Sequence, residues 1–302
     1  MSQILVVGSL AYDSIQTPSG KVDKTLGGSA NYFSLAASLF SKVRVVGVVG
    51  SDYNSEDKKM LSDRGVDLAG LEEVKGETFH WAGRYEGDLN EAKTLATHLN
   101  VFANFNPQLP EAYKSSEFVF LANIDPDLQT SVLNQIKTPV FVGMDTMNYW
   151  IQSKLDSLKK VIGRVNIVLI NEGEAKQLTG AGNAVAAAPQ ICSMGPEAVI
   201  IKRGEYGFLL YHKDHGFFGL PAMPTAEVID PTGAGDSFAG TVFGYLASLK
   251  RRPHFLDLKM ACVKGTIVSS FTIQDFGMKK LKALDQAQLQ ERLAQFEKIV
   301  SR

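Results

Sequence analysis

The chain has 302 residues, 45% of them hydrophobic, so it can bury a large core and has the size of one big α/β domain. Its 31 basic and 32 acidic side chains nearly cancel and are interspersed, which leaves no basic stripe for a nucleic acid or a membrane surface. No apolar stretch approaches the ~20 residues that cross a bilayer, and no basic region precedes the first apolar run, so we expect a cytoplasmic protein. Cys192 and Cys262 lie far apart in apolar surroundings, which favours buried free thiols over a disulfide or a metal site.

Short apolar runs rich in β-branched residues recur along the chain, with amphipathic stretches between them. The runs cover residues 4–8, 43–50, 118–122, 140–144, 165–170 and 198–202. Strands that are apolar at every position are buried on both faces, as in a parallel sheet covered by helices. These runs therefore predict the central sheet of an α/β fold.

Helical periodicity fills much of the sequence between and after these runs. The candidate helices are residues 29–40, 55–64, 126–136, 151–161, 235–249 and 257–270, with a terminal amphipathic helix from about 281 to 300. Several begin with a start signal, such as Pro126 directly after Asp125. The alternation predicts one doubly wound α/β domain over residues 1–302, with a mostly parallel sheet and helices on both faces.

Two regions break this alternation. Residues 12–26 hold Pro-Ser-Gly between short polar-alternating runs, and residues 77–105 hold two strand-like segments joined by a polar turn at residues 87–90. Four strands with one apolar face do not extend a parallel sheet easily, so we expect them to form a small β-sheet lid. A lid beside the carboxyl ends of the main strands can cover a ligand.

The segment Asp-Pro-Thr-Gly-Ala-Gly-Asp-Ser-Phe-Ala-Gly, from Asp230 to Gly240, carries the strongest chemical signal. Its proline and glycines delay regular structure until Gly235, after which apolar residues repeat at helical spacing. The first N–H groups of a helix have no internal partner and the helix dipole is positive there, so a loop without bulky side chains admits phosphate. From the residues alone, an ordinary helix start with Asp236 in its first turn explains the pattern equally well.

The same segment resembles the C-terminal signature of the ribokinase-like, or PfkB, carbohydrate and nucleoside kinases. Leu-Gly-Gly-Ser-Ala at residues 26–30, followed by residues 43–52, resembles the N-terminal signature of that family. Asn-Glu-Gly-Glu at residues 171–174 resembles its Asn-x-x-Glu motif, and residues 201–207 resemble its strand and turn beside the nucleotide. The motifs follow the family's order across nearly the whole chain, which implies a ribokinase-like fold and ATP-dependent phosphoryl transfer to a hydroxyl group.

By this resemblance Asp236 is the catalytic base that accepts the proton of the attacking hydroxyl, and backbone N–H groups of the Gly-Ala-Gly loop form an anion hole. The anion-hole residues are Gly233, Ala234 and Gly235. The residues assigned to ATP and magnesium are Asn171, Glu174, Lys202, Gly204, Gly207 and Thr232.

Two metal assignments come from the resemblance alone. Glu174 would reach Mg²⁺ through water, and Asp230 with Thr232 would begin a site for a monovalent cation such as K⁺. The spacing of Asn171 and Glu174 by itself favours a capping box at the start of a helix, and only the match to the family motif favours the metal role.

On the acceptor side the resemblance and the placement of polar and aromatic residues nominate one group as substrate-binding: Asp13, Gly27, Gly28, Asn31, Trp81, Arg84 and Asp145. One departure from the family pattern is Tyr32, which stands where the family usually has an asparagine, with Asn31 one residue early. Because a helix turns about 100° per residue, Asn31 and Tyr32 point in different directions. The role of Asp13 as a turn former stays open on the residues alone.

These features predict a kinase for a sugar or sugar-like hydroxyl, with a nucleoside kinase of the same superfamily as the alternative. A ligand-sensing protein without catalysis on the same fold is a third possibility. A dinucleotide fingerprint fails because Phe238 stands at its final Gly or Ala, and the pair Gly20-Lys21 is followed by Val22, which excludes a P-loop. Relatives in the family often pair through the lid, which makes a homodimer a further expectation.

Overall fold

The structure is a computed structural model that describes residues 3–87, 89–90 and 92–301. Its main sheet has nine strands in the order β13-β12-β11-β10-β9-β8-β1-β4-β5. The strands are β1 (Gln3–Val7), β4 (Lys42–Gly50), β5 (Val66–Val74), β8 (Phe118–Leu121), β9 (Phe141–Met144), β10 (Ile167–Asn171), β11 (Ala198–Lys202), β12 (Phe208–His212) and β13 (Gly216–Leu220). All neighbours from β5 to β11 are parallel, and β12 and β13 add an antiparallel hairpin.

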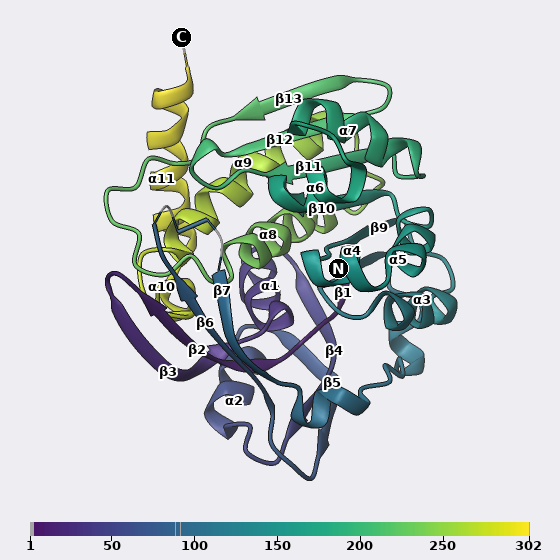
Figure 1. The fold of residues 1–302 in the computed structure, drawn as a ribbon, viewed down its shortest axis with the longest axis vertical. Helices are drawn as coiled ribbons and strands as arrows, with labels where there is room; N and C mark the ends of the chain where they lie inside the picture. Colours follow the sequence, from purple (N-terminus) through teal and green to yellow (C-terminus); the bar gives the residue numbers. More distant parts are fainter. Residues whose placement is uncertain (1–2, 88, 91, 302) are drawn as a thin grey trace.

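Helices cover both faces of this sheet (Figure 1). They are α1 (Ser29–Ser38), α2 (Ser55–Asp63), α3 (Pro126–Gln135), α4 (Asn148–Ser153), α5 (Leu155–Ile162), α6 (Glu172–Thr179), α7 (Ala184–Ser193), α8 (Ala234–Ser248), α9 (Phe255–Thr272), α10 (Lys279–Ala283) and α11 (Gln286–Val300). Successive residues of β1 enter opposite cores: Ile4 and Val6 pack with α1, α8 and α9, whereas Leu5 and Val7 pack with α3, α5 and α7. Burial on both faces explains why the strands are apolar throughout.

A second sheet of four strands, in the order β3-β2-β6-β7, forms the lid. Its strands are β2 (Ala11–Thr17), β3 (Gly20–Gly27), β6 (Phe79–Tyr85) and β7 (Ala92–His98). Figure 1 shows them as a separate purple and blue group at one edge of the main sheet. The predicted lid is therefore confirmed as a separate sheet, although its last strand ends at His98 and Asn100–Asn104 form a 3₁₀ helix. Asp88, within the predicted turn, lies outside the described residues.

Several predicted elements have different limits in the structure. The helix predicted at 151–161 is two helices, α4 and α5, because Lys154 between them has non-helical backbone angles (φ −139°, ψ 40°). The predicted terminal helix is likewise divided into α10 and α11, and Asp285 caps the second with its side chain. Strands β5, β12 and β13 were not predicted as strands. None of the three is buried on both faces like the central strands, and β5 and β13 border the sheet.

Both cysteines are free and buried, as expected. Within the described ranges, no helix is both long enough and apolar enough to span a bilayer.

Candidate active site

The candidate residues meet at the carboxyl ends of the parallel strands. Asn171 ends β10, Lys202 ends β11, and Asp145 directly follows β9. The chain order reverses on the two sides of β1, where β4 and β8 are its neighbours. Ligands of open α/β sheets bind beyond the carboxyl ends of the strands at such a reversal.

The glycine-rich loop leads directly into α8. Gly233 has left-handed backbone angles (φ 74°) at the N-cap position. Among the described residues, no side chain caps α8. An added Cβ on Gly233 would lie 2.4 Å from ring atoms of Tyr32, so only glycine fits there. Residues 231–236 are all half-buried, which leaves the helix start accessible to an anion.

Asp236 lies in the first turn of α8. The pKa of its carboxyl is raised to about 6: burial is the largest cause, the negative charge of Asp145 adds to the rise, and the ammonium of Lys202 opposes it. A carboxylate with a pKa close to neutrality is a better proton acceptor than an ordinary aspartate, while it remains ionised at pH 7. This environment suits the predicted role of catalytic base.

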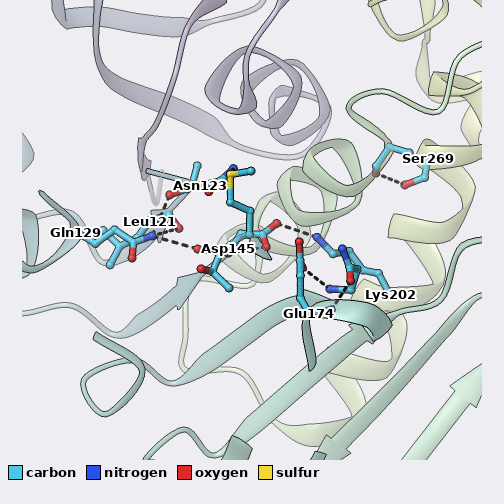
Figure 2. A network of polar contacts seen from close by, with 12 residues as sticks. Leu121, Asn123, Gln129, Asp145, Glu174, Lys202 and Ser269 are labelled. Atoms are coloured by element: carbon cyan, nitrogen blue, oxygen red, sulfur yellow. Dashed lines mark hydrogen bonds and ion pairs between the residues drawn. The ribbon is translucent and has the colours of Figure 1, made fainter. Parts of the chain in front are cut away.

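Lys202 supplies the positive charge beside α8. Its Nζ lies 2.8 Å from Oδ2 of Asp145, and both side chains are largely buried. An added Cβ on Gly235 would lie 3.0 Å from that Nζ, which places the ammonium against the first turn of α8. Figure 2 shows Asp145 between Gln129 and Lys202, joined to both by dashed lines.

Asn171 and Glu174 form the capping box of α6. Oδ1 of Asn171 accepts a bond of 2.8 Å from the N–H of Glu174, and Oε2 of Glu174 accepts one of 2.9 Å from the N–H of Asn171. The pKa of Glu174 is raised to about 7, mainly by burial and next by the negative charge of Asp145, while Lys202 opposes the rise. The capping interpretation is thus confirmed, and one oxygen of Glu174 has no role in the cap.

Asp13, in β2, brings a second carboxyl to the site from the lid. Its pKa is raised to about 7, and burial is the largest cause; a hydrogen bond from the backbone of Gly28 opposes the rise, and the charges of Asp230 and Asp236 add to it. An added Cβ on Gly27 would overlap that carboxyl group at 2.0 Å, and Gly28 has φ 88° with no room for a Cβ. Gly27 is therefore required to leave room for the Asp13 carboxyl, and Gly28 is required where the chain passes the backbone of residues 9–11.

Tyr32 and Asn31 diverge as expected from their positions in α1. Asn31 donates to the carbonyl of Gly27 at 2.7 Å and accepts from the hydroxyl of Tyr53 at 3.2 Å, so its amide is engaged inside the protein. Tyr32 is 1% exposed, and its hydroxyl has no hydrogen-bond partner among the described residues. The charges of Asp13, Asp230 and Asp236 act on that hydroxyl and raise its pKa, after the larger effect of burial. Tyr32, not Asn31, faces the acidic site.

The lid residues divide between its two faces. Trp81 is paired with Asp13 across the parallel strands β2 and β6 and therefore shares its face. Arg84 is three positions further along β6 and lies on the opposite face, where it donates to Gln16 at 3.1 Å. Neither Arg84 nor Asn31 has the placement expected of a direct substrate contact.

Polar contacts join the lid to the glycine-rich loop. The hydroxyls of Tyr85, in β6, and Thr232 are 3.2 Å apart. The carboxyl of Asp230 accepts from the N–H groups of Thr232 and Gly277, both at 2.9 Å. The sequence offered no signal for the Tyr85 contact, because it joins residues 147 positions apart.

The turn after β11 needs its glycines. Gly204 has φ 55° and lies against the side chain of Asn90 from the lid, while Gly207 has φ 81° with the carbonyl of Leu220 where a Cβ would be. The tip of the lid therefore reaches the turn that the sequence assigns to the nucleotide.

A cavity of about 250 Å³ lies elsewhere, at the base of the lid. Its lining consists of Tyr12, Lys24, Asp52, Glu77, Thr78, His80, His98 and Asn100. Tyr12 and His80 lie on the lid face opposite Asp13, and no residue of α8 lines the cavity. We therefore do not place the acceptor there.

The start of α8 is accessible and uncapped, has a lysine and an aspartate beside it, and lies near a lid that carries a buried carboxyl. This arrangement suits a kinase that acts on a small molecule. The pfkB family carbohydrate kinase model matches residues 1–283, and the chain belongs to that family. It is thus an ATP-dependent phosphotransferase that acts on a hydroxyl group.

Known proteins that resemble the chain include nucleoside kinases. It is 32% identical over 256 residues to the cytidine kinase of Thermococcus kodakarensis, covering 83% of this chain and 90% of that protein. The crystal structure of the Methanocaldococcus jannaschii nucleoside kinase aligns with a TM-score of 0.77 at 21% identity, covering 98% of this chain and 99% of that one. A putative ribokinase II from E. coli in complex with ATP and Mg²⁺ aligns with a TM-score of 0.79 at 16% identity, covering 98% and 100%. These structures confirm the ribokinase-like fold.

Proposed function

We propose that the protein transfers the terminal phosphoryl group of ATP to a sugar hydroxyl of a nucleoside. The observation that carries this proposal is the ionisable Asp236 at the uncapped start of α8, within electrostatic reach of Lys202 and of the lid carboxyl of Asp13. The acceptor oxygen forms a bond to the terminal phosphorus, and the bond from that phosphorus to the bridging oxygen breaks to release ADP. The proton of the hydroxyl passes to Asp236.

The anion hole stabilises the charge on the phosphoryl group during transfer. The start of α8 has no capping side chain, and the helix dipole adds positive potential there. Gly233 and Gly235 are the first proposed donors, because the N–H of Ala234 donates to the carbonyl of Pro231 at 3.2 Å in the ligand-free protein and has to leave it to bind an anion. Lys202 lies against the same turn. Gly204 and Gly207 border the nucleotide on the side of β11.

The residues present fit a magnesium ion held mainly by ATP. Asp145, Glu174 and Asp236 gather around one lysine, and burial of their charges is costly without a further cation. Among the described residues, no three metal-ligating side chains form a cage. Mg²⁺ commonly keeps several waters and binds through one or two carboxylates and substrate phosphates. Glu174 and Asn171 would hold it through water, and the ion would offset phosphate charge.

Asp230 and Thr232 are proposed as the beginning of a site for K⁺. Asp230 is 1% exposed, and burial raises the pKa of its carboxyl although backbone N–H groups bind both oxygens. A cation nearby would offset that cost.

The acceptor lies on the Asp13 face of the lid in this proposal. Asp13 accepts hydrogen bonds from sugar hydroxyls, the backbone of Gly27 and Gly28 borders them, and Trp81 offers an aromatic surface for a base. A nucleoside is favoured because the cytidine kinase relative combines 32% identity with nearly full coverage. A free sugar or a sugar-like polyol is the second candidate, since the inositol 3-kinase of Arabidopsis thaliana is also similar, at 25% identity.

An acceptor panel tests this function. ADP release would be measured with Mg²⁺, with and without K⁺, for cytidine, uridine, adenosine, inosine, ribose, fructose and myo-inositol. We expect the highest kcat/KM for a nucleoside, and we expect Asp236→Asn to lower kcat by about 10²- to 10⁴-fold because the proton acceptor is lost.

Asp63→Asn is the matched control, because Asp63 is an exposed carboxylate paired with Lys59 on α2. It should retain the turnover of the native protein. Native turnover in Asp236→Asn would refute the assigned base. Binding of ATP without turnover of any acceptor would favour the ligand-sensing alternative, and a preference for ribose or fructose would identify a sugar kinase.

A further inference from the structure

Asp145 is fully engaged by the protein itself. Its N–H donates to the carbonyl of Leu121 at 2.9 Å, and its carbonyl accepts from Nε2 of Gln129 at 3.1 Å. Its Oδ1 accepts from the N–H of Thr146 at 2.8 Å, and its Oδ2 accepts from Lys202 at 2.8 Å. With the residue 5% exposed, little capacity remains for a direct contact with an acceptor molecule.

Gln129, in α3, makes this arrangement rigid. It is completely buried, and its amide nitrogen also donates to the carbonyl of Ala122 at 3.0 Å. One side chain thus ties the end of β8 to the residue that follows β9 (Figure 2). The backbone of Asp145 is therefore held on both sides, and its carboxylate has a defined direction.

Lys202 needs such an anchor because of where its ammonium lies. The start of α8 carries a partial positive charge, which disfavours a cation against its first turn. Burial lowers the pKa of Lys202, but the charges of Asp145 and Glu174 more than offset that effect, so the pKa ends above its ordinary value. A charged lysine held at a positively polarised helix start is a site prepared for an anion.

We propose that Asp145 is a positioning residue that holds the ammonium of Lys202 at the start of α8, ready for the terminal phosphate of ATP, and is not an acceptor contact. The inference rests on the proposed kinase function. It replaces the sequence-based assignment of Asp145 to substrate binding, which the placement of this residue after a sheet strand had suggested.

A double-mutant cycle of Asp145→Asn and Lys202→Met tests the proposal. Asparagine keeps the shape of the side chain and a group that can accept from Thr146, but removes the charge that holds Lys202. We expect Asp145→Asn to lower kcat about 10²-fold while KM for the acceptor changes less than about twofold, since a misplaced charge affects phosphoryl transfer rather than acceptor binding. In the Lys202→Met background, the same change should alter kcat less than about twofold, because residues that act as a unit are not additive.

Two kinetic outcomes would overturn the proposed role of Asp145. If Asp145 contacts the acceptor, Asp145→Asn will raise KM for the acceptor about tenfold or more in both backgrounds. Additive losses of kcat would also overturn the proposal, because they would show that Asp145 acts independently of Lys202.

Nucleotide binding separates failure of this inference from failure of the proposed function. Dissociation constants for ATP and ADP, measured by calorimetry without an acceptor, do not require turnover. We expect each single variant to reduce the preference for ATP over ADP, by about tenfold for Lys202→Met, and the double variant to resemble Lys202→Met. If the native protein phosphorylates nothing, this coupling can still be measured. If ATP preference is unchanged in Lys202→Met, the inference fails even in an active kinase.

Two further comparisons guard against a trivial loss of structure. Lys202→Met leaves the buried carboxylate of Asp145 without its partner, so its melting temperature should fall and should recover in the double variant. Failure of the double variant to recover would contradict the pairing. Asp125→Asn is the matched control, because Asp125 is paired with Lys154 at the same 2.8 Å but outside the site. It should leave kcat and both KM values unchanged.

Discussion

At the scale of single residues, the buried hydroxyl of Tyr32 destabilises the ligand-free protein, and a bound ligand can supply its missing hydrogen bond. Its hydroxyl is buried without a partner, whereas most buried polar groups in proteins are hydrogen-bonded. The surrounding carboxyl groups belong to the residues proposed for phosphoryl transfer and acceptor binding. We therefore place Tyr32 on the acceptor side, with a hydroxyl that is satisfied when substrate is bound.

Tyr32→Phe should stabilise the free protein and weaken the acceptor. Removal of the unpaired hydroxyl should raise the free energy of unfolding by about 1 kcal/mol, since burial without a partner is unfavourable. KM for the acceptor should rise while KM for ATP stays constant. Tyr53→Phe is the matched control, because the Tyr53 hydroxyl donates to Asn31 and its loss should destabilise the protein. Denaturant unfolding and steady-state kinetics give both readouts, and lower stability in Tyr32→Phe would contradict the argument.

At the scale of elements, the lid combines a site-facing surface with exposed apolar residues. Asp13 and Trp81 share one face, and contacts at Tyr85 and Asn90 join the lid to the loops beside the nucleotide. Leu95, on the border strand β7, is 49% exposed, and Leu99 just beyond it is 46% exposed. Border strands with exposed apolar side chains favour association with another chain.

We propose that two copies of the chain pair through their lids, and Leu95→Asp tests this pairing. Light scattering at micromolar concentration should give a dimer mass for the native protein and a monomer mass for the variant, because a buried charge opposes association. Val185→Asp, on α7, changes an apolar residue that is 56% exposed and far from the lid, and it should leave the mass unchanged. A native monomer, or a dimer that persists in Leu95→Asp, would contradict pairing through this surface.

At the scale of the whole molecule, the site makes the ligand-free protein sensitive to pH. Burial, the largest cause in each case, raises the pKa values of Asp13 and Glu174 to about 7 and that of Asp236 to about 6. A carboxyl whose pKa is higher in the folded state stabilises the fold when it is protonated, and this contribution is lost as pH rises through the folded value. The relevant window therefore runs from about pH 4 to pH 7.

The ligand-free protein should thus lose stability from these groups between about pH 4 and pH 7. Asp236→Asn removes one of them, so its stability should fall less over that interval, by an amount on the order of 1 to 3 kcal/mol. His80 and His212, whose pKa values burial lowers, act in the opposite direction in both proteins and cancel in the comparison. Unfolding in urea at four pH values would measure both slopes, and equal slopes would refute the raised pKa of Asp236.

Residue patterns alone predicted part of the fold. The buried strands β1, β4, β8 and β11 were located within two residues, because continuous apolar runs reflect burial on both faces. The start of α8 and the lid hairpins were found from proline and glycine positions. The border strands β5 and β13 were not, because their half-exposed residues lack such a run.

The sequence by itself determined the fold class, the glycine-rich start of α8 and the presence of Asp236 in its first turn. These features depend on local backbone chemistry and on the order of the motifs. Only the tertiary structure decided which side chains touch. In the structure, the Asn31 amide is hydrogen-bonded inside the protein, and Arg84 lies on the lid face opposite Asp13. The Tyr32 hydroxyl has no hydrogen-bond partner among the described residues, and Asp145 pairs with Lys202, 57 positions away in the chain. Such contacts depend on the packing of distant strands and helices, which no local pattern encodes.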